Sequence, residues 1–568
     1  MIGLVAVTRT GRGAARRLAA SWPDAQLYDG PAATALPRAF AECDAIVCFL
    51  AVGATVRLIA PLLQDKGTDP GLVCVDEALR YAVPVLGAHG GNGNELATRV
   101  AVALGAEAVI TTGSDAAGTV GLDELGADLG FTIEPGSDLA GVGAAILSGE
   151  PVTLVTDQEW PLPALPPNVL TGARPEPPAI VVTDRADVTP GAGIVVYRPP
   201  SLIVGAGASR GVPADEVGQL IDEALSELGV VPTSVMSVGT ADVKADEEGL
   251  RAAAAKHGWP VVLFPAGELA GVPVPNPSEV VRRAVGTPSV AEAAAMLAAG
   301  PGATLIAAKR VSAHATIAVA RRAPRGRLAL IGIGPGARDL MTPRAIAEIR
   351  RASVVVGLEL YLEQVADLLR PGTRVLSSGL GAEQERAETA VAEATAGRAV
   401  ALIGSGDAGI YAMASPALEL ADDRIDVVVV PGVTAALAVA SVLGAPLGHD
   451  HAMISLSDLH TPWRVIERRI AAAADGDLVT CFYNPASAKR DWQLRRACEL
   501  LAAHRPPGTP VGWVRDATRP GQAAALSTLA EFDPGAVDMH TLVVVGSSRT
   551  RIVAGRMVTP RDYTWAGE

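Results

Sequence analysis

The sequence predicts an α/β protein made of several βα-type domains, and three observations support this prediction. The chain has 568 residues, roughly four times the length of a typical domain of about 150 residues, which indicates several packed units. Hydrophobic residues make up 49% and charged residues 19%, as is usual for globular proteins. Short apolar runs alternate with helical patterns almost throughout, which is typical of βα units around a largely parallel sheet.

The composition argues against several classes of protein. The net charge is −14, and no long run of Lys and Arg could form a basic face, so nucleic acid is not an expected partner. The five cysteines form no CxxC pair, which disfavours a disulfide framework or a thiolate zinc site and favours a reducing cytoplasm. The beginning of the chain lacks the positively charged region of a signal peptide.

Residues 427–448 carry no charge over a length that could cross a bilayer, yet Pro431-Gly432 interrupts them. We therefore expect a buried strand, a turn and a buried helix from about Thr434 to Leu443, and no membrane partner.

The first part of the chain, residues 1–120, follows the βα pattern closely. Strands are predicted at Ile2–Thr8, Ala45–Ala51, Gly71–Val75 and Ala108–Thr112, and helices near Ala14–Ala20, Val56–Leu63 and Glu95–Leu104. Residues 121–200 form a less distinctive middle region. Its Pro-rich segment from Trp160 to Pro178 is expected to be an extended connector.

Residues 201–322 form a further unit, with a strand from Leu202, a helix near Asp215–Leu228, a strand at Val261–Phe264 and a closing segment Ala303–Ala320. The basic run 321–327 is expected to be a solvated linker. Residues 1–324 hold 22 Lys and Arg against 34 Asp and Glu, whereas residues 325–568 hold 25 against 27. The two parts therefore have different surfaces.

The last unit, residues 325–568, contains seven further predicted strands. They are Leu328–Ile333, Ser353–Val356, Ala399–Ile403, Val427–Val430, Ala452–Leu456, Leu478–Phe482 and Thr541–Val545.

The first glycine-rich strand exit of this unit, Gly332 to Ala337, fits the GxGxxA spacing of dinucleotide-binding turns. In such folds the helix begins at the glycines, whereas here Thr342 as N-cap and Pro343 at the first helical position predict a later start. The glycines are thus too early to direct helix N–H groups at a phosphate. A tight turn without a ligand remains an alternative for this motif alone.

Two more glycine-rich segments follow strands in the same unit, Gly404-Ser405-Gly406-Asp407-Ala408-Gly409-Ile410-Tyr411 and Pro431-Gly432-Val433-Thr434-Ala435. Three others complete the series: Ser455-Leu456-Ser457-Asp458, Phe482-Tyr483-Asn484-Pro485 and Val545-Gly546-Ser547-Ser548. Together they resemble the tetrapyrrole methyltransferase family across Leu328–Tyr563. GDAGIY and GIGPG with LMTP look most like the precorrin-3B C17-methyltransferases.

The resemblance implies a two-lobed fold and S-adenosylmethionine as cofactor, with methyl transfer at C17 coupled to contraction of a tetrapyrrole macrocycle. It implies that nine residues line the cofactor cleft: Pro335, Ser405, Gly406, Asp407, Ile410, Thr434, Ala435, Asn484 and Ala517. Asp407 as a turn-capping carboxylate and Thr434 as a plain helix N-cap remain alternatives. The uroporphyrinogen-III relatives have an Asp after the second strand. Here that region reads Gly357-Leu358-Glu359, which leaves the role of Glu359 open.

Three histidines, His449, His451 and His460, lie close together in sequence, but no carboxylate or thiolate at ligand spacing completes a metal site. We expect ordinary surface histidines and no resident metal.

The N-terminal half has charged segments near strand ends and a glycine-rich loop, Gly87-Ala88-His89-Gly90-Gly91-Asn92-Gly93-Asn94, before a helix expected to be capped by Asn94. Such a loop exposes N–H groups to an anion, although a glycine-rich turn with a capped helix is an alternative. With the later runs around Gly205–Gly211, Asp242–Leu250 and Val285–Ala293, residues 1–322 resemble cobalt-precorrin-5A hydrolase. The resemblance implies opening of a lactone on the contracted macrocycle, with loss of acetaldehyde.

Lactone hydrolysis needs a base to activate water and donors for the developing oxyanion. His89 is the candidate base, with Asp76 or Glu77 orienting it and Gly90–Gly93 as donors. His89 as a binding or packing residue is the alternative. Arg57, Lys66 and Arg99 are the cations expected to attract substrate carboxylates.

The sequence thus predicts a cytoplasmic fusion of two enzymes of corrin-ring (cobalamin) biosynthesis, which forms a homo-oligomer through the methyltransferase domain. The alternatives are an active methyltransferase with an inactive, structural N-terminal half, or an N-terminal half that holds tetrapyrroles without converting them.

Overall fold

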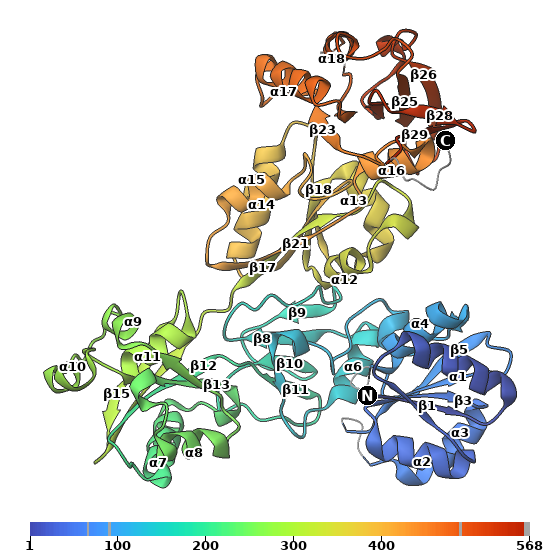
Figure 1. Ribbon diagram of the computed structural model, residues 1–568. Helices are drawn as coiled ribbons and strands as arrows, with labels where there is room; N and C mark the ends of the chain where they lie inside the picture. The colour runs from blue at the N-terminus through green and yellow to red at the C-terminus, as the bar shows by residue number, and fades with distance from the viewer. Residues whose placement is uncertain (65–67, 89–91, 488–490, 562–568) are drawn as a thin grey trace. The chain divides into compact units, whose positions relative to one another are not determined.

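The computed structural model describes residues 1–64, 68–88, 92–487 and 491–561. The chain divides into two compact units, one built from residues 1–324 and the other from residues 325–568, apart from 370–372, which group with the first. Figure 1 shows each unit as a series of sheets flanked by helices. The predicted α/β class is confirmed, since most strand pairs are parallel and helices follow the strands.

The first sheet has the strand order β2-β1-β3-β4-β5-β6, with β5 antiparallel to β4. Its strands are β1 (Ile2–Ala6), β2 (Ala25–Tyr28), β3 (Ala45–Phe49), β4 (Gly71–Val75), β5 (Tyr81–Leu86) and β6 (Glu107–Ala108). The helices are α1 (Arg9–Ser21), α2 (Ala32–Glu42), α3 (Val52–Ile59) and α4 (Gly93–Leu104). β1, β3 and β4 are buried along their whole length or nearly so, which explains why their apolar runs predicted them.

Two expectations for this sheet are wrong. The strand predicted at Ala108–Thr112 is reduced to β6, because Thr112 is the N-cap of a short helix, α5 (Gly113–Ala116). Asn94 does not cap α4. Asn92 occupies the N-cap position with a left-handed backbone, φ 55°, and Asn94 lies one residue inside the helix. The helix therefore starts at Gly93, earlier than the predicted cap at Asn94 allows.

The second sheet has the order β7-β11-β10-β8-β9. It contains β7 (Thr132–Ile133), β8 (Val152–Thr156), β9 (Val169–Thr171), β10 (Ala179–Val182) and β11 (Ile194–Arg198), with α6 (Leu139–Ser148). The Pro-rich segment is extended, but it belongs to this sheet's core and does not act as a connector. Trp160 is 5% exposed and Leu162 9%, and β9 within the segment pairs with β8.

The third sheet, β14-β13-β12-β16-β15, comprises β12 (Leu202–Ala208), β13 (Val235–Ala241), β14 (Val261–Phe264), β15 (Thr304–Val311) and β16 (Ala315–Arg321). Its helices are α7 (Ala214–Leu228), α8 (Glu248–Lys256), α9 (Ala266–Ala270), α10 (Glu279–Val285) and α11 (Ala291–Ala299). α7 and α8 pack on one face and α11 on the other. A Cβ on Gly205 would lie 1.9 Å from the carbonyl oxygen of Ala291, so α11 lies directly on β12.

The basic run 321–327 is not a solvated linker, because its arginines are paired. Arg321 donates to both oxygens of the buried Asp184 at 2.9 and 2.8 Å. Arg327 donates in the same way to Glu348 at 3.1 and 2.6 Å. Bidentate pairing of this kind fixes both the position and the orientation of the guanidinium. Each arginine therefore anchors the end of its own unit.

The second unit begins with a fully parallel sheet, β19-β18-β20-β17-β21. Its strands are β17 (Gly326–Gly332), β18 (Val354–Leu358), β19 (Arg374–Ser378), β20 (Ala399–Gly404) and β21 (Ile425–Val430). α14 (Glu383–Thr395) and α15 (Ala414–Leu420) cover one face, and α12 (Pro343–Arg351) and α13 (Glu359–Val365) cover the other (Figure 1). Because the five strands are parallel, the loops that follow them all lie at the carboxyl edge of the sheet.

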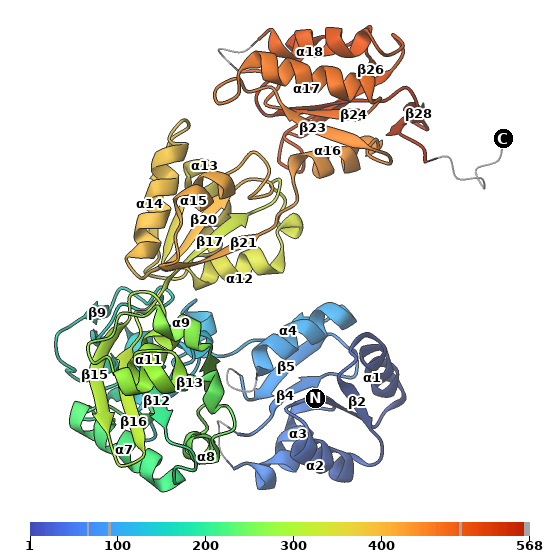
Figure 2. The same ribbon diagram turned by 60° about the vertical axis from the view of Figure 1, so that its left-hand side comes forward.

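The second lobe of this unit begins at α16 (Ala435–Leu443), where the sequence predicts a buried helix. Its main sheet, β23-β24-β27-β25-β26, contains β23 (His451–Ser455), β24 (Val479–Tyr483), β25 (Pro510–Arg515), β26 (Ala523–Thr528) and β27 (Thr541–Val545). A small sheet is formed by β22 (Gly444–Ala445), β28 (Arg551–Val553) and β29 (Arg556–Val558). α17 (Trp463–Asp475) and α18 (Gln493–Ala502) lie side by side on the main sheet (Figure 2).

Candidate functional site

Three glycine-rich strand exits meet at the carboxyl edge of the parallel sheet in the second unit. β17 lies between β20 and β21, so the loops that follow these three strands are neighbours. The N–H of Gly406 donates to the carbonyl of Gly334 at 2.8 Å, and the N–H of Gly334 donates to the carbonyl of Gly406 at 3.1 Å. Two loops that are distant in sequence are thus joined through their backbones.

Gly432 lies in the loop after β21 and allows this loop to approach the loops that follow β17 and β20. A Cβ at this position would lie 2.1 Å from the carbonyl oxygen of Gly406 and 2.6 Å from that of Gly332. The carboxylate of Asp407 then joins the loops, because it accepts the N–H of Gly409 at 2.8 Å and the N–H of Gly432 at 3.0 Å. Asp407 therefore braces the backbone, as the turn-capping alternative expects.

A cavity of about 330 Å³ lies between this edge and the second lobe. Five of the nine residues predicted for the cofactor line it: Pro335, Ser405, Ala435, Asn484 and Ala517. The other four, Gly406, Asp407, Ile410 and Thr434, do not line the cavity and lie in the loops that shape it. The helix that follows the first glycine turn begins at Pro343, with Thr342 as N-cap, as predicted.

Tyr483, at the end of β24, binds the start of α16, where the loop after β21 leads into the second lobe. Its hydroxyl lies 2.6 Å from Oγ1 of Thr434 and accepts the N–H of Ala436 at 3.1 Å. Thr434 occupies the N-cap position of α16, but its side chain makes no capping bond within the helix. Burial raises the pKa of Tyr483 despite these two hydrogen bonds, so the phenol stays protonated at neutral pH.

Arg519 is a residue of this site that the sequence reasoning missed. Its Nε donates to the carbonyl of Pro335 at 2.7 Å, and its Nη2 donates to Oγ of Ser405 at 2.9 Å. Both acceptors are predicted cofactor residues. The available signal was the segment Arg515-Asp516-Ala517-Thr518-Arg519-Pro520, which places charged residues directly after a strand.

Three residues at or beside the cavity have a left-handed backbone, although none of them is glycine. Asn484 has φ 52°, Asp516 has φ 48° and Thr518 has φ 65°. This conformation is uncommon, most of all for a β-branched residue such as Thr518. Such strain of about 1–3 kcal/mol each persists where the surroundings impose it, and it is concentrated at functional sites.

His540 and Asp516 lie beside each other at the cavity. Nδ1 of His540 lies 3.6 Å from Oδ1 of Asp516, and both residues line the cavity. Among the lining residues that the structure describes, His540 is the only histidine. Glu359 begins α13 and is exposed, and it does not line the cavity, although its neighbours Leu358 and Leu360 do.

The lining suits S-adenosylmethionine, which has a flat apolar base, a ribose and a charged amino-acid end. Val439, Val514 and Leu542 supply apolar surface, while Asp516, Arg519 and Asn484 supply groups for the polar ends. A bulky side chain at Gly432 would displace the loops that form one wall. The residues present therefore fit this cofactor.

In the N-terminal half, Asp76 and Glu77 are engaged with their own surroundings. Asp76 accepts the N–H groups of Ala78, Arg80 and Tyr81 at 3.2, 2.7 and 2.7 Å. Burial raises the pKa of Asp76, but these three bonds outweigh it and hold the pKa below its usual value. Glu77 accepts the hydroxyl of Thr8 at 2.8 Å.

The predicted base, His89, lies outside the described residues, as do Gly90, Gly91 and Lys66. Of the other expected cations, Arg99 lies over the ring of Trp22 at 4.8 Å and Arg57 donates to the carbonyl of Gly53 at 2.7 Å. Asn94 donates to Thr112 at 3.0 Å and to Asp115 at 2.9 Å. The side chain of Asn94 thus organises the segment that follows β6.

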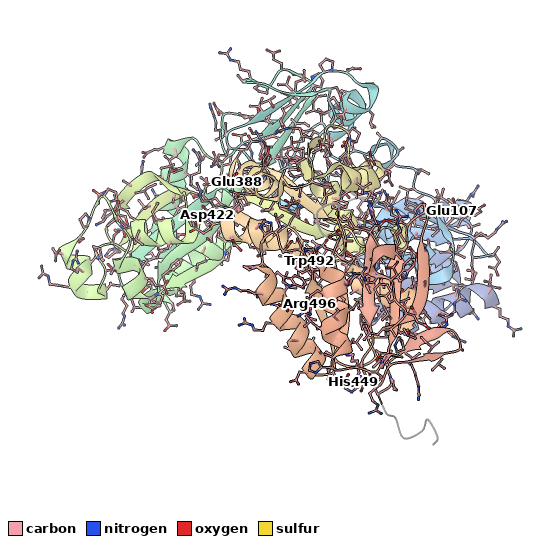
Figure 3. The ribbon with its side chains drawn as sticks, turned by 90° about the horizontal axis from the view of Figure 1, so that it is seen from above. Glu107, Glu388, Asp422, His449, Trp492 and Arg496 are labelled. Atoms are coloured by element: carbon pink, nitrogen blue, oxygen red, sulfur yellow. The ribbon has the colours of Figure 1, made fainter. Side chains whose placement is uncertain are left out.

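Across the described ranges, no group of three or more His, Cys, Asp or Glu residues is arranged to hold a metal ion. His449 lies at the periphery of the second lobe (Figure 3), where its Nδ1 accepts the N–H of Asp450 at 2.8 Å. In the same ranges, no helix combines the length and apolar character needed to span a bilayer.

Comparison with known families assigns each part of the chain. Residues 327–533 match the model of the tetrapyrrole (corrin/porphyrin) methylases. Three further models match in order: cobalamin synthesis G N-terminal at 34–115, the cobalamin biosynthesis central region at 120–199 and the cobalamin synthesis G C-terminus at 202–320.

Individual relatives match the C-terminal unit. A Salmonella typhimurium protein named for cobalt-factor III C17-methyltransferase activity is 48% identical over 240 residues, which are 42% of this chain and 99% of the relative. The precorrin-3B C17-methyltransferase of a Sinorhizobium species is 40% identical over 43% of this chain and 99% of its own length. CobIJ of Mycobacterium tuberculosis is 45% identical, and the chain spans about half of it, 49%.

Two solved structures are also similar. The methyltransferase CobJ is 38% identical, with a TM-score of 0.39, over 41% of this chain and 98% of that chain. A cobalamin biosynthesis protein G homologue from Sulfolobus solfataricus is 21% identical, with a TM-score of 0.25, over 56% of this chain and 96% of that chain.

Proposed function

Since the chain belongs to the tetrapyrrole (corrin/porphyrin) methylases, we propose that its C-terminal unit methylates C17 of precorrin-3B and contracts the macrocycle. The enzyme is bifunctional and acts in cobalamin biosynthesis, because cobalamin synthesis G domains precede the methylase. We assign to these domains the opening of the cobalt-precorrin-5A lactone with release of acetaldehyde. The observation that carries the methylation proposal is the cavity at the junction of the three glycine-rich loops.

The cofactor is S-adenosylmethionine, which supplies an electrophilic methyl group when bound. The chain then has to hold donor and acceptor in line and exclude water, which contributes to rate through orientation. Ser405, Asn484 and Arg519 provide polar contacts, and Ala435 and Ala517 leave space for the ligand. Tyr483 and Thr434 fix the start of α16, so the two walls of the cavity keep their separation.

Ring contraction also requires proton transfers, and His540 is suited to them. Its imidazole is half exposed, and Nδ1 lies 3.6 Å from the carboxylate of Asp516. Histidine changes its charge near neutral pH, as a general acid or base must. We assign His540 as the proton-transfer group and Asp516 as the residue that positions it.

The alternative to hydrolysis is that the N-terminal half holds a tetrapyrrole without converting it. The carboxylate of Asp76 favours this alternative, since within the described residues its hydrogen bonds go to the turn that it closes. His89 stays a predicted catalytic base.

The test is anaerobic incubation of the full chain with S-adenosylmethionine and, separately, precorrin-3B, cobalt-factor III and cobalt-precorrin-5A. Mass spectrometry should show addition of one methyl group to precorrin-3B, and an acetaldehyde assay should respond to cobalt-precorrin-5A. Methylation of cobalt-factor III alone would change the substrate but keep the reaction. No methylated product from either macrocycle would refute the methyltransferase proposal, and methylation without acetaldehyde would leave the retention function.

A further inference from the structure

A second cavity, of about 430 Å³, lies at the carboxyl end of β12 in the first unit, away from Asp76 and Glu77 on the first sheet. Four segments line it: residues 207–210 at the end of β12, Lys244 after β13, α10, and the end of β15 with the turn into β16. The start of α11 closes it at Ser289 and Ala291. The volume is within the range of small-molecule sites, roughly 300–1,000 Å³.

The charge of this cavity is opposite to that of its surroundings. Its ionisable lining residues are Arg210, Lys244, Lys309 and His314, and no Asp or Glu lines it. The chain has only five lysines, and two of them are here, in a half with 34 acidic residues against 22 basic ones. Within the part of the chain that the structure describes, neither lysine ammonium nor the Arg210 guanidinium has a hydrogen-bond or ion-pair partner.

Two carboxylates lie near the cavity, but their oxygens are already occupied. Oε1 of Glu216 accepts the hydroxyl of Ser312 at 2.6 Å and the backbone N–H of His314 at 2.7 Å, and its Oε2 lies 3.1 Å from Nδ1 of His314. Glu292, which is fully buried, accepts both nitrogens of Asn276 and the backbone N–H of Lys309. These carboxylates hold the lining segments in place and leave the three cations available to a ligand.

The remaining wall is apolar and open to solvent. Val280 on α10 is 72% exposed and Val311 at the end of β15 is 64% exposed, and Val281 and Val285 extend this surface. Exposed apolar side chains beside convergent polar groups are typical of ligand sites. An apolar face with a cationic rim complements a flat apolar ring that carries carboxylates at its edge.

We propose that this cavity binds a carboxylate-bearing edge of the macrocycle, with Arg210, Lys244 and Lys309 pairing with its acidic side chains. The proposal rests on the proposed function of the N-terminal half and adds a substrate-binding site to it. It also accounts for how an acidic half attracts a polycarboxylate, since long-range attraction is not available. The glycine-rich turn could also hold a phosphate, but the exposed valines favour the organic ligand.

Binding of a corrin heptacarboxylate, dicyanocobyrinic acid, to the full chain tests the proposal by titration calorimetry. Lys244→Met with Lys309→Met should weaken binding about tenfold, because exposed ion pairs contribute roughly two- to fivefold each. Lys256→Met is the matched control, since Lys256 is exposed on α8 and lines no described cavity. The neutral heptamethyl ester of the same corrin should bind at least tenfold more weakly than the acid.

Equal binding by the double variant and the control, equal binding of acid and ester, or displacement of the acid by millimolar inorganic phosphate would each overturn the proposal. If the double variant does not fold by circular dichroism, Arg210→Gln with Lys244→Gln replaces it, because Arg210 is exposed and Lys244 only partly buried.

The acetaldehyde assay separates this proposal from the proposed function. Lysine-dependent binding without acetaldehyde release from the unmodified chain supports the cavity and refutes the hydrolase. Acetaldehyde release with an unchanged KM in the double variant refutes the cavity and supports the hydrolase.

Discussion

Nη2 of Arg519 donates a hydrogen bond to Oγ of Ser405 at 2.9 Å across 114 positions of sequence. Ser405 follows β20 in the first lobe of the C-terminal unit and Arg519 follows β25 in the second, so the bond joins the two walls of the cofactor cavity. The same guanidinium also binds the carbonyl of Pro335.

Replacing Arg519 with Met should weaken S-adenosylmethionine binding by about ten- to a hundredfold, because two hydrogen bonds that position the predicted cofactor residues disappear. Arg519→Lys should recover only part of this loss, since an ammonium cannot reproduce the two-nitrogen geometry. Titration calorimetry measures both variants. Arg495→Met, an exposed arginine on α18, is the control. Unchanged binding in Arg519→Met would show that the bond is dispensable.

Tyr483→Phe and Thr434→Val should each lower kcat/KM for methylation roughly five- to tenfold, because each removes one partner of a partly buried hydrogen bond. The double variant should resemble the single ones, since residues in contact are not additive. Thr395→Val, whose exposed hydroxyl only binds its own helix, is the control. Additive losses would mean that the two hydroxyls act separately.

Gly432→Ala should abolish methylation and destabilise the second unit by about 1–3 kcal/mol, the usual cost of overpacking. Its Cβ would lie 2.1 Å from the carbonyl oxygen of Gly406. Gly379→Ala is the matched control, because nothing lies within 4 Å of its added Cβ. Thermal unfolding and the methylation assay measure the two effects. A fully active Gly432→Ala enzyme would contradict the close approach of the three loops.

Asp76→Asn should lower the stability of the turn after β4 by about 1 kcal/mol at neutral pH, because the charge on the acceptor is lost. The folded-state pKa of Asp76 is depressed, so its contribution is complete above the unfolded value of about 3.9 and is lost as the pH falls through the folded value. Hydrogen exchange of the Arg80 and Tyr81 amides measures it. A difference that persists at pH 2 would exclude this origin.

His89→Ala should slow acetaldehyde release by about 10²–10⁴, the usual contribution of a positioned general base. Methylation of precorrin-3B should not change, because the methylase match begins at residue 327. A loss below about threefold would make His89 a packing or binding residue.

Many strands predicted from sequence are buried along their length, as β1, β4 and β27 are, whereas β14 is an exposed edge strand with an apolar sequence. β4, β14 and β27 have the predicted bounds, and β1 and β3 end within two residues of them. Some of the missed strands are exposed or interrupted, but β10 and β11 are buried and lie in the middle region, where no strand was predicted. β19 is largely exposed and starts with Arg374, β26 begins with three alanines, and β5 contains Pro84. A continuous apolar run therefore predicts a strand even at a sheet edge, whereas a strand interrupted by polar residues, small residues or proline gives no such signal.

The candidate site could be predicted only where a motif marks it. The strand-exit motifs that resemble the tetrapyrrole methyltransferases imply Pro335, Ser405 and Asn484, all of which line the cavity. Arg519 could not be found in this way, because its partners lie in another lobe and the contact depends on tertiary packing. The two lysines of the second cavity could not be predicted for the same reason. Lys244 follows β13 and Lys309 lies near the end of β15, so only the tertiary fold brings them together.

The left-handed backbone of Asn484, Asp516 and Thr518 has a consequence for engineering and evolution. Glycine at Thr518 would relieve strain, so a screen for heat-resistant variants should select it. The gain would come from the loop that carries Ala517 and Arg519 to the cavity, and turnover would then fall as the melting temperature rises. Thr518 is therefore a position where selection for thermal stability and selection for catalytic turnover favour different residues.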